Sequence, residues 1–470
     1  MKNSSTKNII WSYVGIFFTY GFNLFLLPLV LKYLSSAELG LWYTFASVGT
    51  TISLLDFGFS PCIMRNVGHV WGGVQEIRGN GIVVGGNNNG VNYPLLNDVI
   101  RASRDIYSVV SVVVLIIALV PGTFYINSVL EDINPLYGLS TWGIYGVAVS
   151  INLYFTYWNA TLRGLGGVAD GQKANIAAKI VQFSISLIGL IMGFGLWALS
   201  VAYLCTGVTF RFLSKKACLK ILEKEKFNIK GKCKDNQLRK NIMSNSIRFG
   251  IATLSTQIVS QSMQLICTSV YGLEASARYG LSVQLLNVIV TVGFAYYNAV
   301  FPEINIARAS GDLDKQRKLV SMGAVAQWIV CSIGVLCLII IGPSLIGYIS
   351  DKTMLETVPL IILSASYMIE YNRTLFTMYI STSNKLPYTK AVLISSLVIA
   401  GSSVLLPTIV KVPFVVILII RLLVESAYNG WKWMITAMKD LELKTYQMFK
   451  IAISSIIISI KHNEKTAGIS

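Results

Sequence analysis

The segment IYSVVSVVVLIIALVPGTFYI, residues 106–126, contains no charged side chain. About twenty apolar residues cross a hydrocarbon core of roughly 30 Å as one helix, because a helix satisfies its backbone polar groups internally. Similar runs recur along a chain that is 54% hydrophobic and only 13% charged, against roughly 25% charged in soluble domains. The sequence therefore predicts an all-α polytopic membrane protein and excludes a soluble globular domain.

Runs of this kind predict about twelve transmembrane helices. The first run is too long for the core of a signal peptide and lacks a small-residue cleavage site, so we expect it to remain as a helix. The apolar stretch 448–460 is too short to span comfortably. The helices are expected near residues 9–31, 42–64, 106–126, 141–162, 175–194, 196–213, 247–270, 280–302, 319–349, 357–380, 389–410 and 412–430.

A basic stretch divides this series into two halves. Residues 214–240 hold ten Lys and Arg against three acidic residues, and we interpret them as a solvated tether beside anionic lipid. The expected domains are a six-helix bundle at 1–213, a cytoplasmic linker at 214–246, a second six-helix bundle at 247–435, and a cytoplasmic or interfacial tail at 436–470. The segments 40–61 and 280–302 both run from Gly to Pro, which suggests a duplication and a substrate site between the halves.

The net charge of +17 marks topology. Lys and Arg concentrate in alternate connections, as in the positive-inside pattern of membrane proteins. This pattern predicts an even number of helices with both termini cytoplasmic, and it favours membrane lipid over nucleic acid as the partner. Four of the 39 basic residues fall on the other side: Lys32, Arg278, Lys352 and Lys411.

Signatures of catalysis are missing from the sequence. The run GGNNNG at 85–90 lacks the Lys-Ser/Thr that completes a phosphate-binding loop, and is most simply a flexible loop. Two histidines and seven scattered cysteines predict no metal site or cofactor, and the cysteines are expected to be reduced. Glu131 and Asp132 form an outer acidic pair in a short loop, and a loop role is the simpler interpretation. We therefore expect no enzymatic activity.

Charged residues inside the predicted helices are the first candidate site. Arg421 lies near the middle of its helix with Glu425 one turn on, and Glu370 and Arg373 are three residues apart. An ionised group at the bilayer centre costs roughly 2.5–3.5 kcal/mol, so such residues usually face a wet cavity or a partner. The two pairs are either neutral structural bridges or part of a functional site. Asp56 is a further carboxylate at membrane depth.

Polar residues at other helix positions form a second candidate site. Gln257, Gln261 and Gln264 recur on one face of the helix at 247–270. Such a stripe suits a hydrated pathway for sugars, but it also suits hydrogen bonds that hold helices together. Arg65 and Arg248 lie at cytoplasmic helix ends, where they either extend to the interface or meet an anionic substrate.

Residues 33–66, YLSSAELGLWYTFASVGTTISLLDFGFSPCIMRN, resemble the start of O-antigen and other polysaccharide flippases of the Wzx type. These belong to the multidrug/oligosaccharidyl-lipid/polysaccharide exporter (MOP) superfamily. The resemblance rests on Glu38-Leu39-Gly40, on Asp56-Phe57-Gly58 and on Arg65-Asn66. Residues 163–176, RGLGGVADGQKANI, and 301–315, FPEINIARASGDLDK, are similar to the second and fourth cytoplasmic turns of the family.

The resemblance implies two six-helix bundles around a central cationic cavity in a bacterial cytoplasmic membrane. It implies transport of a polyprenyl-pyrophosphate-linked oligosaccharide, such as a lipopolysaccharide O-antigen repeat, with other polysaccharide-assembly membrane proteins as conceivable partners. A pyrophosphate needs Arg or Lys partners away from water. The residues expected to bind substrate are Arg421, Arg373, Arg248, Arg65, Gln257, Gln261 and Gln264, and those expected to couple an ion are Asp56, Glu370 and Glu425.

Two alternatives remain open. A drug or cation antiporter of the same superfamily shares the topology but favours an acidic, aromatic-lined cavity with few arginines. A membrane polysaccharide polymerase or ligase needs a large outer loop, which this sequence does not offer. The arginines at 373 and 421 disfavour the first alternative, and the short outer connections disfavour the second.

Overall fold

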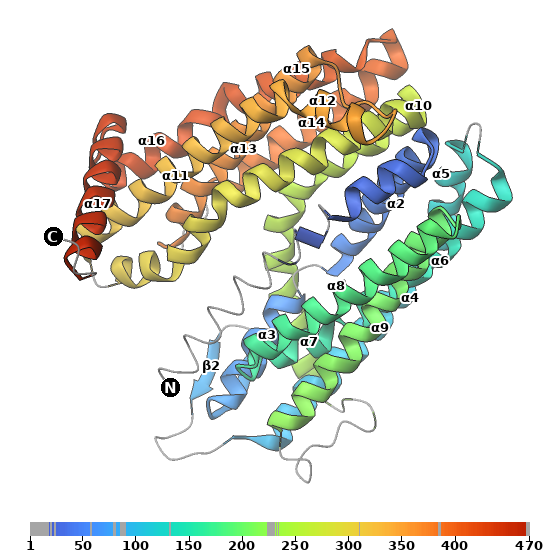
Figure 1. The fold of residues 1–470 in the computed structure, drawn as a ribbon. Helices are drawn as coiled ribbons and strands as arrows, with labels where there is room; N and C mark the ends of the chain where they lie inside the picture. Colours follow the sequence, from blue (N-terminus) through green and yellow to red (C-terminus); the bar gives the residue numbers. More distant parts are fainter. Residues whose placement is uncertain are drawn as a thin grey trace. The chain divides into compact units, whose positions relative to one another are not determined.

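A computed structural model of the chain describes residues 18, 21, 22, 25–56, 59–78, 81–84, 91–130, 133–222, 231, 233, 235–309, 311–383 and 387–466. For 244–258 and 456–466 it describes the backbone alone. Contacts divide the chain into two units, Met1–Ala277 and Arg278–Ser470. Each unit consists almost entirely of helices (Figure 1). The domain limits expected from sequence, at 213 and 246, stay a prediction.

The first unit begins with helical residues 25–33 and ends within α10, Asn236–Ala309, which also enters the second unit. Between them lie α2 Ser36–Ser53, a 3-10 turn Leu54–Asp56, α3 Phe59–Trp71, β1 Val74–Arg78, β2 Gly81–Val84, α4 Tyr93–Ile117, a π-helical turn Ala118–Gly122, α5 Thr123–Ser128, α6 Pro135–Tyr154, α7 Thr156–Gly164, α8 Val168–Ile191 and α9 Leu196–Ile221.

Helix α10 changes direction at Gly272, where φ is 86° and ψ is 173°. Glycine adopts such a conformation without the steric cost that a Cβ brings. The second unit follows with α11 Leu313–Ile340, α12 Gly342–Ile349, α13 Thr357–Ser381, α14 Thr389–Val410, α15 Phe414–Val424, a π-helical turn Glu425–Asn429, α16 Gly430–Asp440 and α17 Thr445–Thr466.

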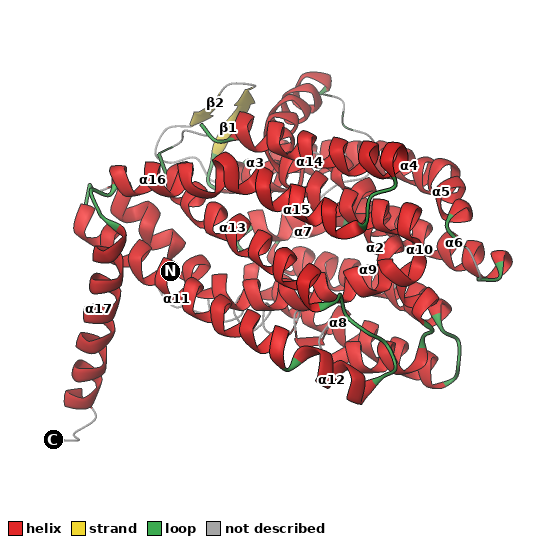
Figure 2. Ribbon diagram, turned by 90° about the horizontal axis from the view of Figure 1, so that it is seen from above, coloured by secondary structure: helices red, strands yellow, loops and turns green. Residues whose placement is uncertain are grey.

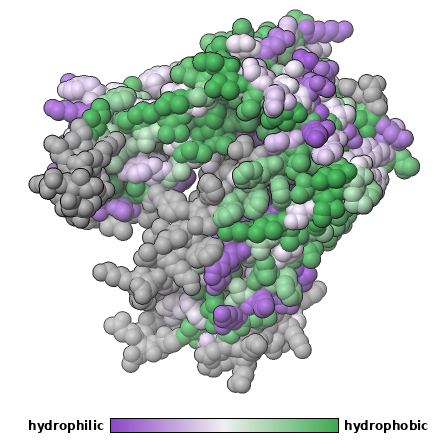
Figure 3. All heavy atoms as spheres, viewed as in Figure 1, coloured by the Kyte–Doolittle hydropathy of each residue, from purple (hydrophilic) through white to green (hydrophobic). Residues whose placement is uncertain are grey.

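The surface of these helices is that of a multi-pass membrane protein. On α4, Val109, Val112, Val113 and Ile116 are exposed, and they lie in the uncharged half of the helix that follows Asp105. Figure 3 shows apolar residues along the flanks of the helices. The expected count of twelve stays a prediction, but seven described segments are long and apolar enough to span: Tyr93–Ser128, Val168–Ile191, Leu196–Ile221, Gln261–Asn298, Leu313–Ile340, Thr389–Val410 and Phe414–Asp440.

Several expected helices differ from those in the structure. The helix expected at 42–64 is interrupted after Ser53 by the 3-10 turn, and the helix expected at 319–349 divides at Gly342-Pro343. Proline lacks the N–H that an interior helical position donates, so it begins α12 instead of continuing α11. The helix expected at 175–194 starts earlier, at Val168, and this shift moves its charged residues deeper into the helix.

The loop that precedes α4 contains an antiparallel hairpin, β1–β2 (Figure 2). The hairpin lies in a connection expected to be a loop, and the rest of the described chain is helical or in short turns and connections. Val74 and Ile77 are each 5% exposed, so β1 buries its β-branched residues. The run at 85–90, expected to be a flexible loop, lies outside the described residues.

Glu38, part of the family-like sequence, ties three helix ends together. It forms a capping box with Ser35: Ser35 N donates to Glu38 Oε2 at 2.8 Å, and Glu38 N donates to Ser35 Oγ at 3.1 Å. Its other oxygen accepts from Tyr137 Oη at 2.8 Å, and Tyr137 Oη in turn accepts from Leu196 N at 2.7 Å. One carboxylate thus links the first turns of α2, α6 and α9.

Gly40, two residues further on, packs directly against the backbone of α10. A Cβ at this position would lie 1.9 Å from the carbonyl oxygen of Leu273. We expect Gly40→Ala to destabilise the protein by about 2–3 kcal/mol, because a backbone atom cannot move aside as a side chain can. Thermal unfolding of the purified protein in detergent measures this effect.

Gly143 provides the matched control, because a Cβ there would meet nothing within 4 Å. Gly143→Ala, in α6, should be neutral or slightly stabilising, since alanine is the better helix former by about 1 kcal/mol. Equal melting temperatures for the two variants would contradict the close contact at Gly40.

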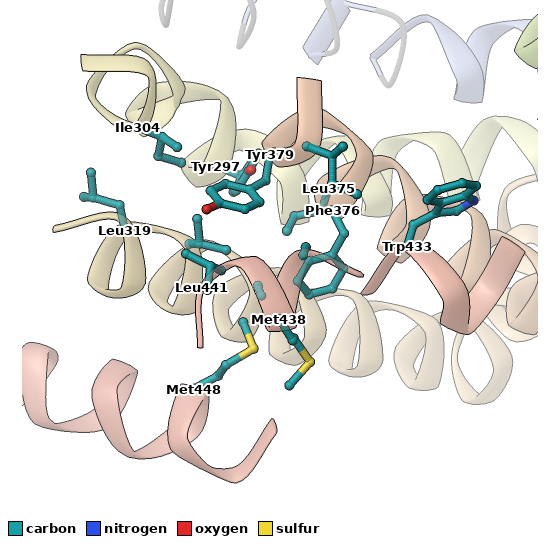
Figure 4. Close-up of a cluster of buried hydrophobic side chains, with 14 of the residues drawn as sticks. Tyr297, Ile304, Leu319, Leu375, Phe376, Tyr379, Trp433, Met438, Leu441 and Met448 are labelled. Atoms are coloured by element: carbon teal, nitrogen blue, oxygen red, sulfur yellow. The ribbon is translucent and has the colours of Figure 1, made fainter. Parts of the chain in front are cut away.

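The second unit has a core at one end of α10, α11, α13, α16 and α17 (Figure 4). Tyr297, Phe376, Tyr379, Trp433 and Met438 belong to it and are at most 8% exposed. Aromatic and thioether side chains fill the space among these helices. The core therefore stabilises the helix ends that the fourth family-like turn, residues 301–315, connects.

That turn is fixed by ion pairs and hydrogen bonds to its neighbours. Arg308 Nη1 donates to Asp440 Oδ2 at 2.5 Å and to Tyr379 Oη. Asp312 caps α11 by accepting from Lys315 N at 2.9 Å. These contacts explain the residue types in the turn without a role in substrate binding.

Candidate functional site

Four charged residues meet between α13 and α15 in the second unit. Arg421 Nη2 donates to Glu370 Oε2 at 2.7 Å. Arg373 lies between two carboxylates, with Nη2 3.7 Å from Glu370 Oε1 and Nε 3.7 Å from Glu425 Oε2. Two arginines and two glutamates give this charge cluster, as we call it, a formal charge of zero.

The structure corrects one pairing considered from sequence. The local-bridge interpretation joined Arg421 to Glu425 within one helix, but Arg421 pairs with Glu370 on another helix. Glu425 N still donates to the carbonyl of Arg421, as in an α-helix. The packing of α15 against α13 therefore decides the pairing, because it offers each of these two residues a partner on the other helix. The pair Glu370–Arg373 does lie within ion-pair distance, at 3.7 Å.

The charge cluster is buried and incompletely hydrogen-bonded. Arg421, Glu425 and Arg373 are 1%, 3% and 4% exposed. Among the described residues, Arg421 Nε and Nη1, Arg373 Nε and Glu425 Oε2 have no hydrogen-bond partner. Buried polar groups are normally paired, so unpaired ones require a ligand, a water or a functional reason. The Arg421 guanidinium also lies 4.9 Å from the centre of the Tyr367 ring, a cation–π distance.

The π-helical turn beside the cluster is held from two directions. Asn429 Nδ2 donates to Ser395 Oγ at 2.8 Å, and Trp433 Nε1 donates to Asn429 Oδ1 at 3.0 Å. Single π-helical turns occur frequently at functional sites. Here the turn ends α15 and places Glu425 beside α13, where Arg373 lies.

Asp56 ends the 3-10 turn after α2, in the first unit. Tyr107 Oη on α4 donates to Asp56 Oδ1 at 2.5 Å. The carboxylate therefore lies where the helix expected at 42–64 is interrupted, with a hydroxyl as its partner. Its expected role in ion coupling stays a prediction, as do those of Glu370 and Glu425.

The glutamine stripe is partly used to join helices. Gln264 Nε2 donates to Ser276 Oγ at 2.6 Å, and Ser276 Oγ lies 2.8 Å from Thr268 Oγ1. Thr268 Oγ1 lies 2.8 Å from Thr44 Oγ1 on α2. All four residues are buried. The amide of Gln264 thus takes part in contacts within the first unit.

The other expected substrate-binding residues belong to the first unit. Gln261 is partly buried on α10, and Arg65 is exposed on α3. The side chains of Gln257 and Arg248 lie outside the described residues. Substrate contact by any of these residues remains a prediction.

Lys179 is a residue that the sequence reasoning missed. It is the twelfth of the 24 residues of α8, and its Nζ donates to Gln182 Oε1 at 2.9 Å. It is absent from the ion pairs formed by the described residues. A lysine at membrane depth beside a neutral amide is a functional candidate. Its signal is visible in the sequence once α8 is known to start at Val168.

The cysteines are free thiols, as expected: Cys62, Cys205, Cys218, Cys233, Cys267, Cys331 and Cys337. Burial raises the pKa of the Cys233 thiol in the linker, which disfavours the thiolate form. No group of three or more metal-binding side chains occurs among the residues that the structure describes.

Comparison with known proteins identifies the fold. No family model matches the sequence, and no curated protein matches it. Among solved structures, an inward-facing multidrug resistance MATE family transporter of the MOP superfamily matches with a TM-score of 0.64 and 12% identity, covering 91% of this chain and 95% of the transporter. This chain has the fold of MOP superfamily transporters.

Two further structures with the MOP fold have different named functions. The MATE multidrug transporter DinF-BH matches with a TM-score of 0.64 and 13% identity, covering 94% of this chain and 97% of DinF-BH. The lipid II flippase MurJ in an inward closed conformation matches with a TM-score of 0.62 and 11% identity, covering 96% of this chain and 91% of MurJ. Structural likeness at sequence identities this low shows a shared fold and does not determine the substrate of this chain.

Proposed function

We propose that this chain transports a polyprenyl-pyrophosphate-linked oligosaccharide from the cytoplasmic to the outer leaflet of a bacterial cytoplasmic membrane. The observation that carries the proposal is the set of cationic groups at membrane depth. Arg421 and Arg373 keep N–H groups without partners in the described residues, and Lys179 has an amide as its described partner. The likeness in fold to a lipid II flippase supports the same substrate class.

The chemistry of such a substrate fits these groups. A pyrophosphate carries several negative charges, and charge-assisted hydrogen bonds from Arg and Lys stabilise it away from bulk water. The polyprenyl tail can stay in lipid, so only the headgroup and sugars need a polar path. No covalent bond forms or breaks, and alternating access is sufficient.

A drug or cation antiporter is the second candidate, and one observation favours it. The charge cluster holds as many carboxylates as guanidinium groups, and the Glu370 side chain is 19% exposed. Tyr367 and Tyr371 stack beside it at 6.2 Å. An organic cation would find carboxylate and aromatic partners there.

Deletion of the gene in its own host separates the two candidates. A flippase mutant should accumulate lipid-linked oligosaccharide on the cytoplasmic face and lose the surface polysaccharide, and a plasmid copy should restore both. An antiporter mutant should instead become sensitive to cationic drugs with the surface polysaccharide unchanged. That second outcome would refute the flippase proposal.

Ion coupling through Asp56 is a testable part of the proposal. A carboxylate in a low-dielectric site can exchange a proton between conformations. We expect Asp56→Asn to lower gradient-driven transport by about tenfold or more, because the amide cannot titrate and its hydrogen bond from Tyr107 is weaker than one to a charged group. Transport is measured in vesicles with and without an imposed proton or sodium gradient.

Tyr107→Phe is the matched control, since it removes the hydrogen bond but keeps the carboxylate. This variant should lose stability and still respond to the gradient. If Asp56→Asn keeps a full response, Asp56 is structural and coupling lies with Glu370, with Glu425 or elsewhere.

A further inference from the structure

The N-terminal end of α8 and the C-terminal end of α9 enclose a groove of about 1020 Å³ within the first unit. The two helices lie side by side in both ribbon views (Figures 1 and 2). Among the described residues, the charged ones that line the groove are Asp170, Lys173, Lys215, Lys216 and Lys220. Four lysines and one aspartate leave this groove, which we call the α8–α9 groove, with a formal charge of +3.

The lysines of the α8–α9 groove differ in the groups that lie near their positive charges. Lys173 Nζ lies 3.7 Å from Asp170 Oδ1, and this pair is neutral. Lys215 Nζ lies 5.9 Å from the centre of the Trp158 ring, which orients the charge without neutralising it. Lys216 and Lys220, one helical turn apart, are exposed. Three lysines therefore face one space, and Asp170 supplies the one carboxylate among its described lining residues.

The walls of the α8–α9 groove are apolar. Ala174 and Ala177 line it from α8, and Phe212 and Leu219 line it from α9. Phe212 is 65% exposed, and both helices are long and apolar enough to span a membrane. The groove thus combines a cationic end with a side open toward the acyl chains of the bilayer.

We propose that the α8–α9 groove binds an anionic phospholipid of the cytoplasmic leaflet. The positive-inside pattern of the sequence places this end of α8 and α9 on the cytoplasmic side, where anionic headgroups meet lysines. Basic pockets between transmembrane helices on that side bind phosphate-bearing lipids. A soluble phosphate would use the lysines but leave the apolar walls without a partner. The proposal is independent of which substrate the protein transports.

The test is lipid binding by the purified full-length protein, measured by native mass spectrometry with phosphatidylglycerol and with phosphatidylcholine. The wild type should retain phosphatidylglycerol preferentially. The triple variant Lys215→Gln/Lys216→Gln/Lys220→Gln should lower phosphatidylglycerol binding by roughly a hundredfold, since each lysine near a headgroup contributes about fivefold. Phosphatidylcholine binding should not change.

Two matched variants decide between a built site and general charge attraction. Lys439→Gln/Lys444→Gln/Lys450→Gln removes the same charge from exposed lysines outside the groove and should leave binding unchanged. Ala177→Phe keeps every charge but fills the apolar wall, and it should lower phosphatidylglycerol binding at least about tenfold.

Four results would overturn the proposal. An equal loss in the two triple variants would show general charge attraction. Unchanged phosphatidylglycerol binding in Ala177→Phe would show that the apolar wall takes no part in binding. Full competition by inorganic phosphate would show that the lysines bind a soluble phosphate. Binding of both lipids alike would show that the groove has no preference for an anionic headgroup.

Discussion

Replacement of Arg421 by methionine should abolish transport and destabilise the second unit by about 3–5 kcal/mol, because it leaves the partly buried carboxylate of Glu370 without its closest partner. Glu370 would then keep only the longer contact to Arg373, at 3.7 Å. The charge cluster would carry a formal charge of −1 at membrane depth. Thermal unfolding in detergent and restoration of surface polysaccharide in a deletion strain measure the two effects separately.

The double variant Arg421→Met/Glu370→Leu separates structure from substrate contact. It removes one charge of each sign and leaves the pair Arg373–Glu425, so folding should return close to wild type. If Arg421 contacts the pyrophosphate, transport should stay absent. Arg421→Lys should be partly active at best, because a point charge loses the planar geometry of the guanidinium. Full transport activity of the double variant would show that Arg421 does not contact the substrate.

Lys179→Met should change stability and transport in opposite directions. Removal of a charge from membrane depth should stabilise the folded protein by about 1–3 kcal/mol. Transport should fall by about tenfold to a hundredfold, since a charge-assisted contact to the substrate anion is lost. Melting temperature and flipping in reconstituted vesicles provide the two measurements.

Two controls accompany the lysine variant. Lys179→Arg keeps the charge and should keep most of the transport. Gln182→Leu removes the hydrogen-bond partner of Lys179 and should lower stability while transport persists. A Lys179→Met protein that is both less stable and fully active would show that the lysine is purely structural.

Much of the helical layout could be predicted from the sequence because lipid-spanning helices are continuous apolar runs. The helix expected at 389–410 has the same ends as α14, and the one expected at 196–213 starts with α9. Prediction failed where polar residues extend a helix beyond its apolar run. Helix α8 begins at Val168, and its first turns hold Asp170 and Lys173, so hydropathy alone placed Lys179 near the start of the helix expected at 175–194 instead of near the middle.

The residues of the charge cluster could be predicted from the sequence, but the ion pairs that they form could not. Charged residues at membrane depth stand out in any apolar run, and Arg421, Arg373, Glu370 and Glu425 were found this way. Their partners depend on the packing of α13 against α15, which brings Arg421 to Glu370 and Arg373 to Glu425. This packing does not follow from the spacing of residues along one helix.

The family-like sequence motifs have structural explanations of their own. A Cβ at Gly164, in the second family-like turn, would lie 2.6 Å from the carbonyl oxygen of Met64, so the turn requires glycine for close approach to α3. Arg308 connects its turn to α16 and Asp56 accepts from Tyr107. A resemblance carried by such positions reports how helices join, which explains why it indicates the fold better than the substrate.

The hydrogen bonds around Glu38 have a mechanical consequence. One continuous chain of hydrogen bonds runs through Ser35, Glu38, Tyr137 and Leu196. It connects the first turns of α2, α6 and α9 and restrains them relative to one another. Any rearrangement of these helices in the proposed transport cycle must either carry the three ends together as a rigid body or break this chain first. We expect α2 to bend instead at its other end, at the 3-10 turn that Asp56 completes.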